Sequence, residues 1–221
     1  MSRKDLASAE QLMIDGARSF DLELSPRQLA AFAGYRHLLS VWGARLNLTA
    51  IREDALVVRL HFLDSLSVVP LLSRADALMD IGSGAGFPGI PIKLVSPEKP
   101  VYLVEPRRKR ANFLRHVIRE LDLTDAHVIE SRAEDMPTTD IPPMMETVTR
   151  GFSDIPEFVK ASGKLLGPKG TGVLMQGPKG PARLDELRGW LSLYGFTEGP
   201  TVRFSLPFGS EQRTVLTFKN V

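Results

Sequence analysis

The spacing of hydrophobic residues changes near residue 78, and the change divides the chain into two kinds of predicted structure. Within residues 1–75, apolar side chains recur at helical spacing in three segments. Ser25 is a suitable N-cap for the second segment, and Pro26 fits its first helical position. Pro70 interrupts the third segment. The pattern predicts an N-terminal helical layer over residues 1–75.

After that layer, short apolar runs alternate with stretches long enough for a helix. The runs expected to form strands are residues 77–81, 101–105, 127–131, 146–150 and 172–176. Strands joined by crossover helices predict a mostly parallel sheet. A helix near 182–194 precedes two terminal apolar stretches, 198–207 and 211–220, which predict an antiparallel pair. The sequence therefore predicts an α/β core over residues 76–221, with the helical layer packed on it as one compact unit.

Composition limits the class of protein. A chain of 221 residues is long enough for one sizeable core, and 43% hydrophobic with 24% charged residues is ordinary for a globular protein. The absence of cysteine excludes disulfides and thiolate metal sites, and the four histidines are too scattered to predict a metal site. Neither a signal peptide nor an apolar run of membrane-spanning length is found, so we expect a cytoplasmic protein that does not insert into a membrane.

The segment "DIGSGAGFPG", residues 80–89, follows the first predicted strand and opens a helix, where free backbone N–H groups can bind a ligand. Read from Gly84, its glycines have the spacing of a dinucleotide-binding loop. Read from Gly82, the set Gly82, Gly84 and Gly86 has the spacing of an S-adenosylmethionine loop. Under either interpretation, Glu105 at the end of the second strand is placed to accept hydrogen bonds from a ribose. Glycine spacing alone leaves both cofactors open.

Asp80 favours one of the two cofactors. It stands two residues before Gly82, where a dinucleotide would place a pyrophosphate beside a carboxylate of like charge. S-adenosylmethionine instead carries an ammonium and a sulfonium, which a carboxylate attracts. We therefore predict S-adenosylmethionine as the cofactor. A nicotinamide oxidoreductase is the less favoured alternative, and it predicts tight binding of NAD.

Five segments together resemble one known family. They are "LNLTAI" (46–51), "HFLDSLS" (61–67), "DIGSGAGFPGIPIKL" (80–94), "KRANFLRHV" (109–117) and "ESRAEDM" (130–136). Their order and spacing resemble those of the RsmG family, also called GidB, of bacterial 16S rRNA guanine-N7 methyltransferases, over nearly the whole chain. The resemblance implies a Rossmann-like class I methyltransferase fold behind a helical layer. It also implies methyl transfer from S-adenosylmethionine to the guanine-527 site of 16S rRNA.

Carried over by position, the resemblance implies a set of cofactor contacts. These residues are Gly82, Phe87, Ala133, Glu134 and Arg150. Ala133 and Glu134 would lie beside the adenine, where a backbone N–H and a side-chain acceptor can read its edge. At three sites the sequence departs from the family pattern. Thr149-Arg150-Gly151-Phe152 replaces Ser-Arg-Ala-Phe, Gln176-Gly177 with Lys179 replaces Lys-Gly, and Glu105-Pro106 replaces aspartate and a small residue.

The expected chemistry requires no general base, because guanine N7 carries an available lone pair and no proton. Catalysis would rest on aligning N7 with the methyl group. Asn47, His61 and Asp64 lie in segments that match the family and are candidates for positioning the guanine. Their alternative roles are a helix-end cap, a partly buried imidazole and a surface acid. No catalytic residue is assigned.

A local concentration of positive charge suggests where RNA binds. Net charge is only +2, yet residues 106–119 hold six basic side chains and no acid. On a helix from about 107 to 121, Arg108, Arg115 and Arg119 fall on one face away from the apolar stripe. We predict that these three and Lys109 contact RNA phosphates, although a solvated surface would show the same pattern.

Two further alternatives remain open at this stage. A small-molecule methyltransferase would share the glycine loop without needing the basic helix, and a non-catalytic RNA-binding protein would keep the basic helix and tolerate loss of the loop. The RNA substrate could be naked 16S rRNA, an assembly intermediate or the small ribosomal subunit. We expect a monomer, since no segment is an obvious site of self-association.

Overall fold

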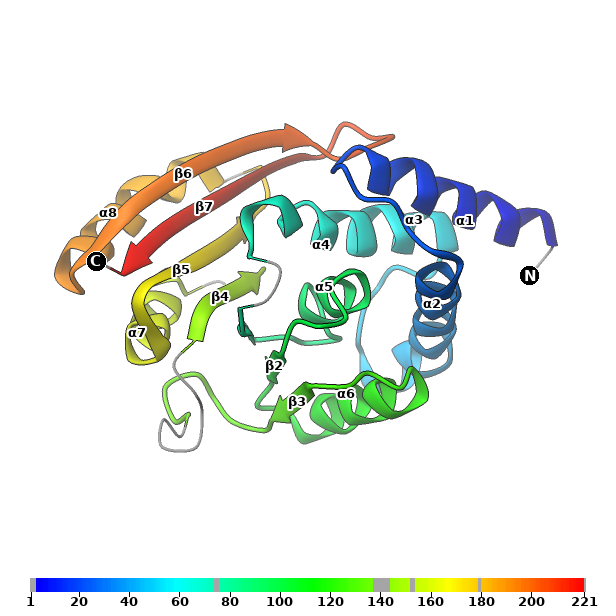
Figure 1. The fold of residues 1–221 in the computed structure, drawn as a ribbon, viewed down its shortest axis with the longest axis horizontal. Coiled ribbons are helices and arrows are strands. Elements are labelled where there is room, and N and C mark those ends of the chain that lie inside the picture. Colours follow the sequence, from blue (N-terminus) through cyan, green and yellow to red (C-terminus); the bar gives the residue numbers. More distant parts are fainter. Residues whose placement is uncertain (1–2, 74–75, 137–143, 152–153, 179, 221) are drawn as a thin grey trace.

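The computed structural model describes residues 3–73, 76–136, 144–151, 154–178 and 180–220 (Figure 1). Its centre is a seven-stranded sheet in the order β3-β2-β1-β4-β5-β7-β6. The strands are β1 (Leu78–Ile81), β2 (Val101–Val104), β3 (Ala126–Ile129), β4 (Met144–Arg150), β5 (Leu166–Gln176), β6 (Phe196–Ser205) and β7 (Gln212–Asn220). The first five are parallel, and β7 pairs antiparallel with both β5 and β6. The predicted fold, with its C-terminal antiparallel pair, is confirmed.

Two groups of helices cover the faces of this sheet. The parallel strands are flanked by α5 (Gly89–Val95), α6 (Arg108–Glu120), α7 (Ile155–Leu165) and α8 (Leu184–Leu193), with a short 3-10 turn at Gly180–Arg183. Alternate residues of β1 serve the two faces: Leu78 packs in the core with α5 and α6, whereas Met79 and Ile81 pack with α7 and α8. Asp80 points to the α5 face because side chains alternate along a strand.

The N-terminal layer begins with α1 (Arg3–Arg18) and α2 (Pro26–Leu46). The predicted start of α2 is confirmed: Ser25 Oγ accepts the Gln28 backbone N–H at 3.3 Å, and the Gln28 side chain accepts the Ser25 N–H at 2.8 Å. This reciprocal pair is a capping box, which satisfies backbone donors that the helix itself leaves free. The helix ends at Asn47, which adopts a left-handed conformation with φ of 50°.

The third helical segment is less regular than the sequence predicts. It contains α3 (Asp54–Val57), a π-helical turn (Val58–Leu63), α4 (Asp64–Leu66) and a 3-10 turn (Val69–Leu71) that includes Pro70. The interruption at Pro70 is therefore confirmed, while the π-turn has no counterpart in the prediction. A π-turn inserts extra backbone into a helix and is frequent at functional sites. Here it carries His61.

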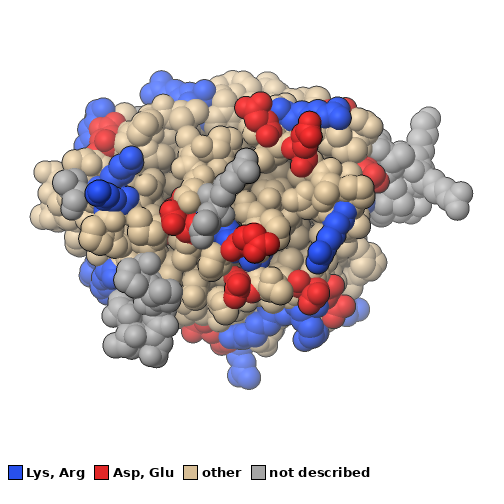
Figure 2. All heavy atoms as spheres, in the orientation of Figure 1, with Lys and Arg blue, Asp and Glu red and all other residues tan. Residues whose placement is uncertain are grey.

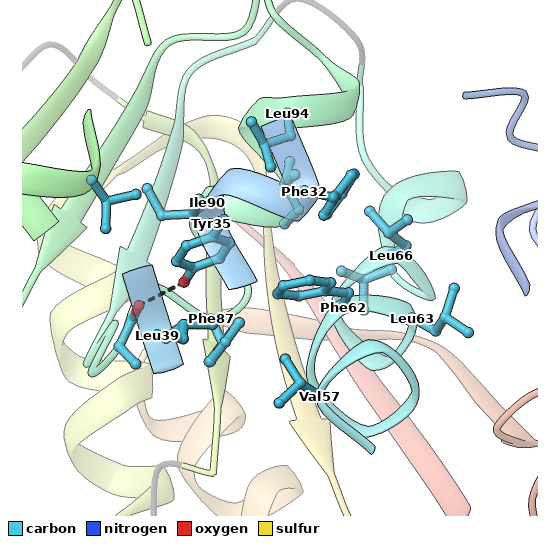
Figure 3. Close-up of a cluster of buried hydrophobic side chains, with 14 of the residues drawn as sticks. Phe32, Tyr35, Leu39, Val57, Phe62, Leu63, Leu66, Phe87, Ile90 and Leu94 are labelled. Atoms are coloured by element: carbon cyan, nitrogen blue, oxygen red, sulfur yellow. Dashed lines mark hydrogen bonds between the residues drawn. The ribbon is translucent and has the colours of Figure 1, made fainter. Parts of the chain in front are cut away.

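One hydrophobic cluster joins the N-terminal layer to the sheet. Phe32 and Tyr35 of α2 and Phe62 of the π-turn pack against Phe87 and Ile90, which lie in or beside the glycine loop (Figure 3). The Tyr35 and Phe62 rings stack with centroids 5.4 Å apart. The helical layer therefore forms one wall of the loop's surroundings. Within the part of the chain that the structure describes, no helix is both long and apolar enough to cross a membrane.

Candidate functional site

The glycine loop connects β1 to α5 and takes backbone conformations that favour glycine. Gly82, Gly84 and Gly86 have φ angles of 78°, 59° and 105°. A Cβ atom at Gly86 would lie 2.7 Å from the Tyr35 hydroxyl, so no side chain fits there. Among the described residues, a Cβ at Gly84 would meet only the Gly82 carbonyl oxygen, at 3.9 Å. The loop is thus tightly packed behind Gly86 and open at Gly84, where a ligand can approach its backbone.

Asp80 lies directly behind this loop and is completely buried. Its Oδ2 accepts the Gly89 backbone N–H at 2.9 Å, which caps the start of α5. Its Oδ1 is also buried and has no hydrogen-bond partner among the described residues. Burial raises the pKa of this carboxyl from 3.8 to about 7, against the opposing effect of the Gly89 hydrogen bond. An unpartnered buried oxygen of this kind is costly unless a donor reaches it.

Glu105 closes the opposite side of the loop. It follows β2 and is only 3% exposed. Its Oε2 accepts the Gly84 N–H at 3.0 Å, and its Oε1 accepts the Arg107 N–H at 2.8 Å. Each carboxylate oxygen retains capacity for a second hydrogen bond. The carboxylate is therefore held in a fixed orientation next to the loop, with acceptors left for a ligand.

A pocket of about 360 Å³ opens beside the loop. It is lined by Gly82, Val104, Pro106, Arg107, Ser131, Arg132, Ala133, Glu134 and Glu157. Three residues named from the sequence as cofactor contacts, Gly82, Ala133 and Glu134, therefore meet at one cavity. Glu157 of α7 was missed, because α7 approaches the pocket only through the tertiary fold. Its hydrogen bond with Glu134 raises the pKa of the Glu157 carboxyl to about 7.

A second cluster lies on the other side of the loop, around Phe87. The His61 ring stacks on the Phe87 ring with centroids 4.5 Å apart and planes at 22°. The Arg150 guanidinium carbon lies 4.7 Å from the centre of the same ring. Arg150 donates to the Leu60 carbonyl at 3.1 Å and to His61 Nδ1 at 3.2 Å. Through Arg150, the end of β4 thus contacts both the glycine loop and the π-turn.

Both ring nitrogens of His61 have hydrogen-bond partners. Nδ1 lies 3.1 Å from the Leu60 carbonyl oxygen and 3.2 Å from Arg150 Nη2. Nε2 lies 2.7 Å from Thr49 Oγ1. Burial and the nearby Arg150 charge lower the pKa of His61 to about 4. His61 is therefore neutral at physiological pH, with both ring nitrogens engaged in holding the cluster together.

Asp64 links this cluster to the C-terminal strands. Its Oδ2 lies 3.4 Å from Arg150 Nη1, and its Oδ1 accepts from Arg213 Nε at 2.9 Å. Asp64 is 4% exposed, so its charge is compensated by two guanidinium groups. Arg213 was not identified from the sequence, since it lies 149 residues from Asp64 and belongs to no motif. Its strand, β7, brings it to the site.

The third positioning candidate is separate from this cluster. Asn47 is exposed at the end of α2, and its backbone carbonyl accepts a hydrogen bond from Arg110 Nη2 of α6 at 3.0 Å. Its neighbour Thr49 is the residue that contacts His61. The segment "LNLTAI" thus bridges the π-turn and the start of α6.

The basic side chains of α6 differ in how far their charges are compensated. Arg115 pairs with Glu130 at 3.0 Å, and Arg119 lies 3.5 Å from Glu120. Arg108 and Lys109 are exposed at the N-terminal end of α6 and form no ion pair within the described residues. Figure 2 shows basic and acidic side chains intermixed along the lower edge, where Figure 1 places α6. Uncompensated charge is concentrated at the end of α6 next to the pocket.

At the sites that depart from the family pattern, the structure describes the surroundings of Arg150 and Gln176. Arg150 occupies the cluster described above. Gln176 is 9% exposed, and its Oε1 accepts from Arg183 Nη1 at 3.4 Å. Phe152 and Lys179 lie outside the described residues. Among the residues that are described, no group of three or more histidine or acidic side chains is arranged to hold a metal ion.

Sequence comparisons find one family. A family model described as GidB, rRNA small subunit methyltransferase G, matches residues 28–201. The chain is 35% identical over 206 residues to the ribosomal RNA small subunit methyltransferase G of Geobacter sulfurreducens, covering 93% of this chain and 95% of that protein. Identity to the protein of the same name from Acetivibrio thermocellus is 33% over 231 residues, covering 99% and 91%.

Solved structures show the same fold at low sequence identity. A SAM-dependent methyltransferase from Aquifex aeolicus superposes with a TM-score of 0.59 at 17% identity, covering 75% of this chain and 93% of that one. TYW2 from M. jannaschii, solved in complex with AdoMet, gives a TM-score of 0.56 at 15% identity over 72% and 75% of the two chains.

Proposed function

The chain belongs to the rRNA small subunit methyltransferase G family, and from this membership we propose that it methylates N7 of a guanine in 16S rRNA, at the guanine-527 site. Its cofactor is S-adenosylmethionine and its reaction is methyl transfer. The observation that carries the proposed site is the buried Asp80 carboxyl behind the glycine loop, one oxygen of which has no partner among the described residues.

The residues around the loop fit this cofactor. An ammonium group would supply the hydrogen bond and the positive charge that the Asp80 Oδ1 lacks. The open backbone at Gly84 admits a ligand, and Glu105 beside it keeps acceptors for ribose hydroxyls. The adjoining pocket of about 360 Å³ is large enough for a nucleobase between Gly82 and Ala133. In this arrangement Glu134 accepts from the exocyclic amino group.

We assign positioning rather than proton transfer to the cluster around Phe87. S-adenosylmethionine supplies an electrophilic methyl group, and guanine N7 is a nucleophile without a proton to remove. His61 is neutral with both nitrogens hydrogen-bonded, and Asp64 is held by two arginines, so neither is free to act as a base. Their contacts fix Phe87 and Arg150 next to the loop. Orientation of two reacting groups can by itself supply much of the rate enhancement.

For RNA we assign the main phosphate contacts to the N-terminal end of α6. Arg108 and Lys109 are exposed and adjoin Arg107, which lines the cofactor pocket. Arg115 and Arg119 have acidic partners that already compensate part of their charge. RNA binding of this kind should weaken with salt, because phosphate counterions are released on binding.

The deciding experiment uses labelled S-adenosylmethionine and three unmethylated substrates: naked 16S rRNA, an assembly intermediate and the small ribosomal subunit. After digestion of the RNA, 7-methylguanosine at the 527 site supports the proposal, and the preferred substrate identifies the form that is recognised. Label in other nucleosides only, or in none of the three RNAs, would contradict it. Methylation of small molecules alone would favour the alternative methyltransferase class.

A further inference from the structure

The turn between β6 and β7, residues 206–211, lies at the edge of the sheet that carries the glycine loop. The last residue of β5, Gln176, pairs with Thr214 of β7, so the turn extends beyond the carboxyl end of β5. Because β1, β4 and β5 are parallel, their carboxyl ends share this edge, and the glycine loop follows β1. Figure 1 shows the turn reaching toward the N-terminal helices. The turn and the glycine loop therefore lie at the same edge of the sheet.

Phe208 lies in this turn with two energetically unfavourable features, an exposed aromatic ring and a left-handed backbone conformation. Its side chain is 56% exposed, although it is a large apolar group. Its φ angle is 60°, in the left-handed region that bulky residues rarely adopt. Exposed single apolar residues are common, but an exposed aromatic on strained backbone is not. The surrounding structure must enforce this conformation.

The enforcing contacts come from both sides of the interface between the hairpin and the helical layer. Arg59 of the π-turn donates to the Phe208 carbonyl at 3.1 Å and pairs with Glu211 at 3.0 Å. Conversely, Arg213 of β7 in the hairpin forms an ion pair with Asp64 of the helical layer. Leu206 is 1% exposed and anchors the start of the turn in the core. The backbone of Phe208 is thus held by Arg59, and the hairpin that carries Phe208 is connected through Arg213 and Asp64 to Arg150.

The surroundings of Phe208 indicate what it binds. Around the turn, Arg203, Ser205, Ser210 and Gln212 are exposed and polar, and the charges of Arg59 and Glu211 compensate each other. A lone aromatic ring among polar groups offers too little apolar area for a protein interface or a membrane surface. Stacking on one unpaired nucleobase requires only the face of the ring, and positive charge nearby favours the RNA backbone.

We propose that Phe208 is an RNA-binding residue that stacks on an unpaired base of the substrate near the target guanine. This inference rests on the proposed function, since it takes RNA as the substrate. It adds a second RNA contact at the far side of the loop from α6. An RNA segment bound at both would cross the edge of the sheet where the cofactor loop lies.

The test compares RNA binding and methylation by Phe208→Ala, Phe208→Trp and Phe208→Gly. Loss of one stacked base should weaken RNA binding about 5- to 150-fold, the range expected for stacking on an aromatic side chain. Phe208→Trp should bind as well as the wild type. Phe208→Gly removes the ring while relieving the backbone strain, so it should fold normally and bind RNA as weakly as Phe208→Ala. The matched control is Leu193→Ala, which removes a side chain that is 70% exposed on α8.

Two further readouts separate stacking from other roles. Affinity for S-adenosylmethionine should be unchanged in all three variants, and the salt dependence of RNA binding should keep its slope because no phosphate contact is lost. Normal RNA binding by Phe208→Ala or Phe208→Gly would overturn the proposal. So would a defect confined to the assembled subunit, which would indicate a ribosomal protein as the partner. Absence of RNA binding by the wild-type protein would instead overturn the proposed function.

Discussion

The Tyr35 hydroxyl donates a hydrogen bond of 2.6 Å to the backbone carbonyl of Ala85 and so joins α2 to the glycine loop (Figure 3). The two residues are 50 positions apart in the sequence. Burial raises the pKa of Tyr35 well above its ordinary value, so the hydroxyl keeps its proton. The helical layer therefore takes part in fixing the loop conformation.

Replacing Tyr35 with phenylalanine should lower the free energy of unfolding by about 1–3 kcal/mol, because the buried Ala85 carbonyl would lose its donor. Affinity for S-adenosylmethionine should fall as well, since the loop loses a contact that fixes its shape. Urea denaturation and calorimetric titration measure the two effects. Tyr194→Phe, at a residue that is 38% exposed, serves as the control. Unchanged cofactor affinity in Tyr35→Phe would show that the loop is fixed without α2.

Gly84 and Gly86 should differ in their tolerance of alanine. At Gly84 a Cβ meets no close atom, so the substitution brings only left-handed strain, about 1 kcal/mol. At Gly86 the Cβ would also lie 2.7 Å from both Ile90 and the Tyr35 hydroxyl. Gly86→Ala should therefore destabilise the protein by more than Gly84→Ala, as measured by thermal or urea unfolding. Equal destabilisation would mean that the close packing behind Gly86 relaxes easily.

The stability of the protein should vary with pH through two opposing groups. The pKa of His61 is lowered to about 4, so the unfolded chain binds more protons below about pH 6.5, and stability is lost as the pH falls from there toward 4. The pKa of Asp80 is raised from 3.8 to about 7, so the folded chain binds more protons, and stability is lost as the pH rises from about 4 to 7. Each contribution is on the order of 3–4 kcal/mol.

Single variants separate the two contributions. In Asp80→Asn only the His61 contribution remains, so the free energy of unfolding should rise as the pH increases from 4 to 6.5. In His61→Gln only the Asp80 contribution remains, so it should fall as the pH increases from 4 to 7. Unfolding titrations at several pH values give both profiles. Identical pH dependence in the wild type and both variants would contradict the assigned roles.

The same Asp80 carboxyl should make cofactor affinity depend on pH. An ammonium group is attracted to the ionised carboxylate, so wild-type affinity for S-adenosylmethionine should fall as the pH drops below about 7, by up to about tenfold per pH unit. Asp80→Asn should bind more weakly and lose this dependence. Its side-chain oxygen can still accept the Gly89 N–H, so the fold should be retained. Calorimetric titration at pH 6, 7 and 8 checks both expectations.

The basic side chains of α6 should contribute unequally to RNA binding. The double change of Arg108 and Lys109 to glutamate should weaken RNA binding more than the same change at Arg115 and Arg119, whose charges are already paired. Filter binding at two salt concentrations measures affinity and its salt slope. Cofactor affinity should be equal in both double variants, which shows that the fold is intact. Equal effects on RNA would indicate that the whole length of the helix contacts phosphate.

Much of the fold follows from patterns within a few residues. The strand-and-helix alternation after residue 78 predicted all five parallel strands, and Ser25 with Pro26 marked the start of α2 as the structure has it. The glycine loop and Asp80 were recognisable because the required backbone conformations and the charge lie together in ten residues. Periodicity, capping and glycine preference act over one or two turns of chain, and a single sequence displays them directly.

The irregular and long-range features were decided by the tertiary structure. The π-turn at Val58–Leu63 has no local signature, and its conformation accompanies the contacts of His61 with Thr49 and Arg150. The pairing of Arg115 with Glu130 compensates a charge that looked free in the sequence.

The sequence by itself therefore determined the order of elements, the glycine loop and the charged residue behind it. Only the tertiary structure decided that one oxygen of Asp80 has no partner among the described residues, that Arg213 reaches Asp64 across 149 residues, and that Phe208 is held exposed at the same edge. The physical reason is that burial, desolvation and ion pairing depend on which distant segments pack together. Those contacts arise when the sheet and the helical layer assemble, and no spacing along the chain encodes them.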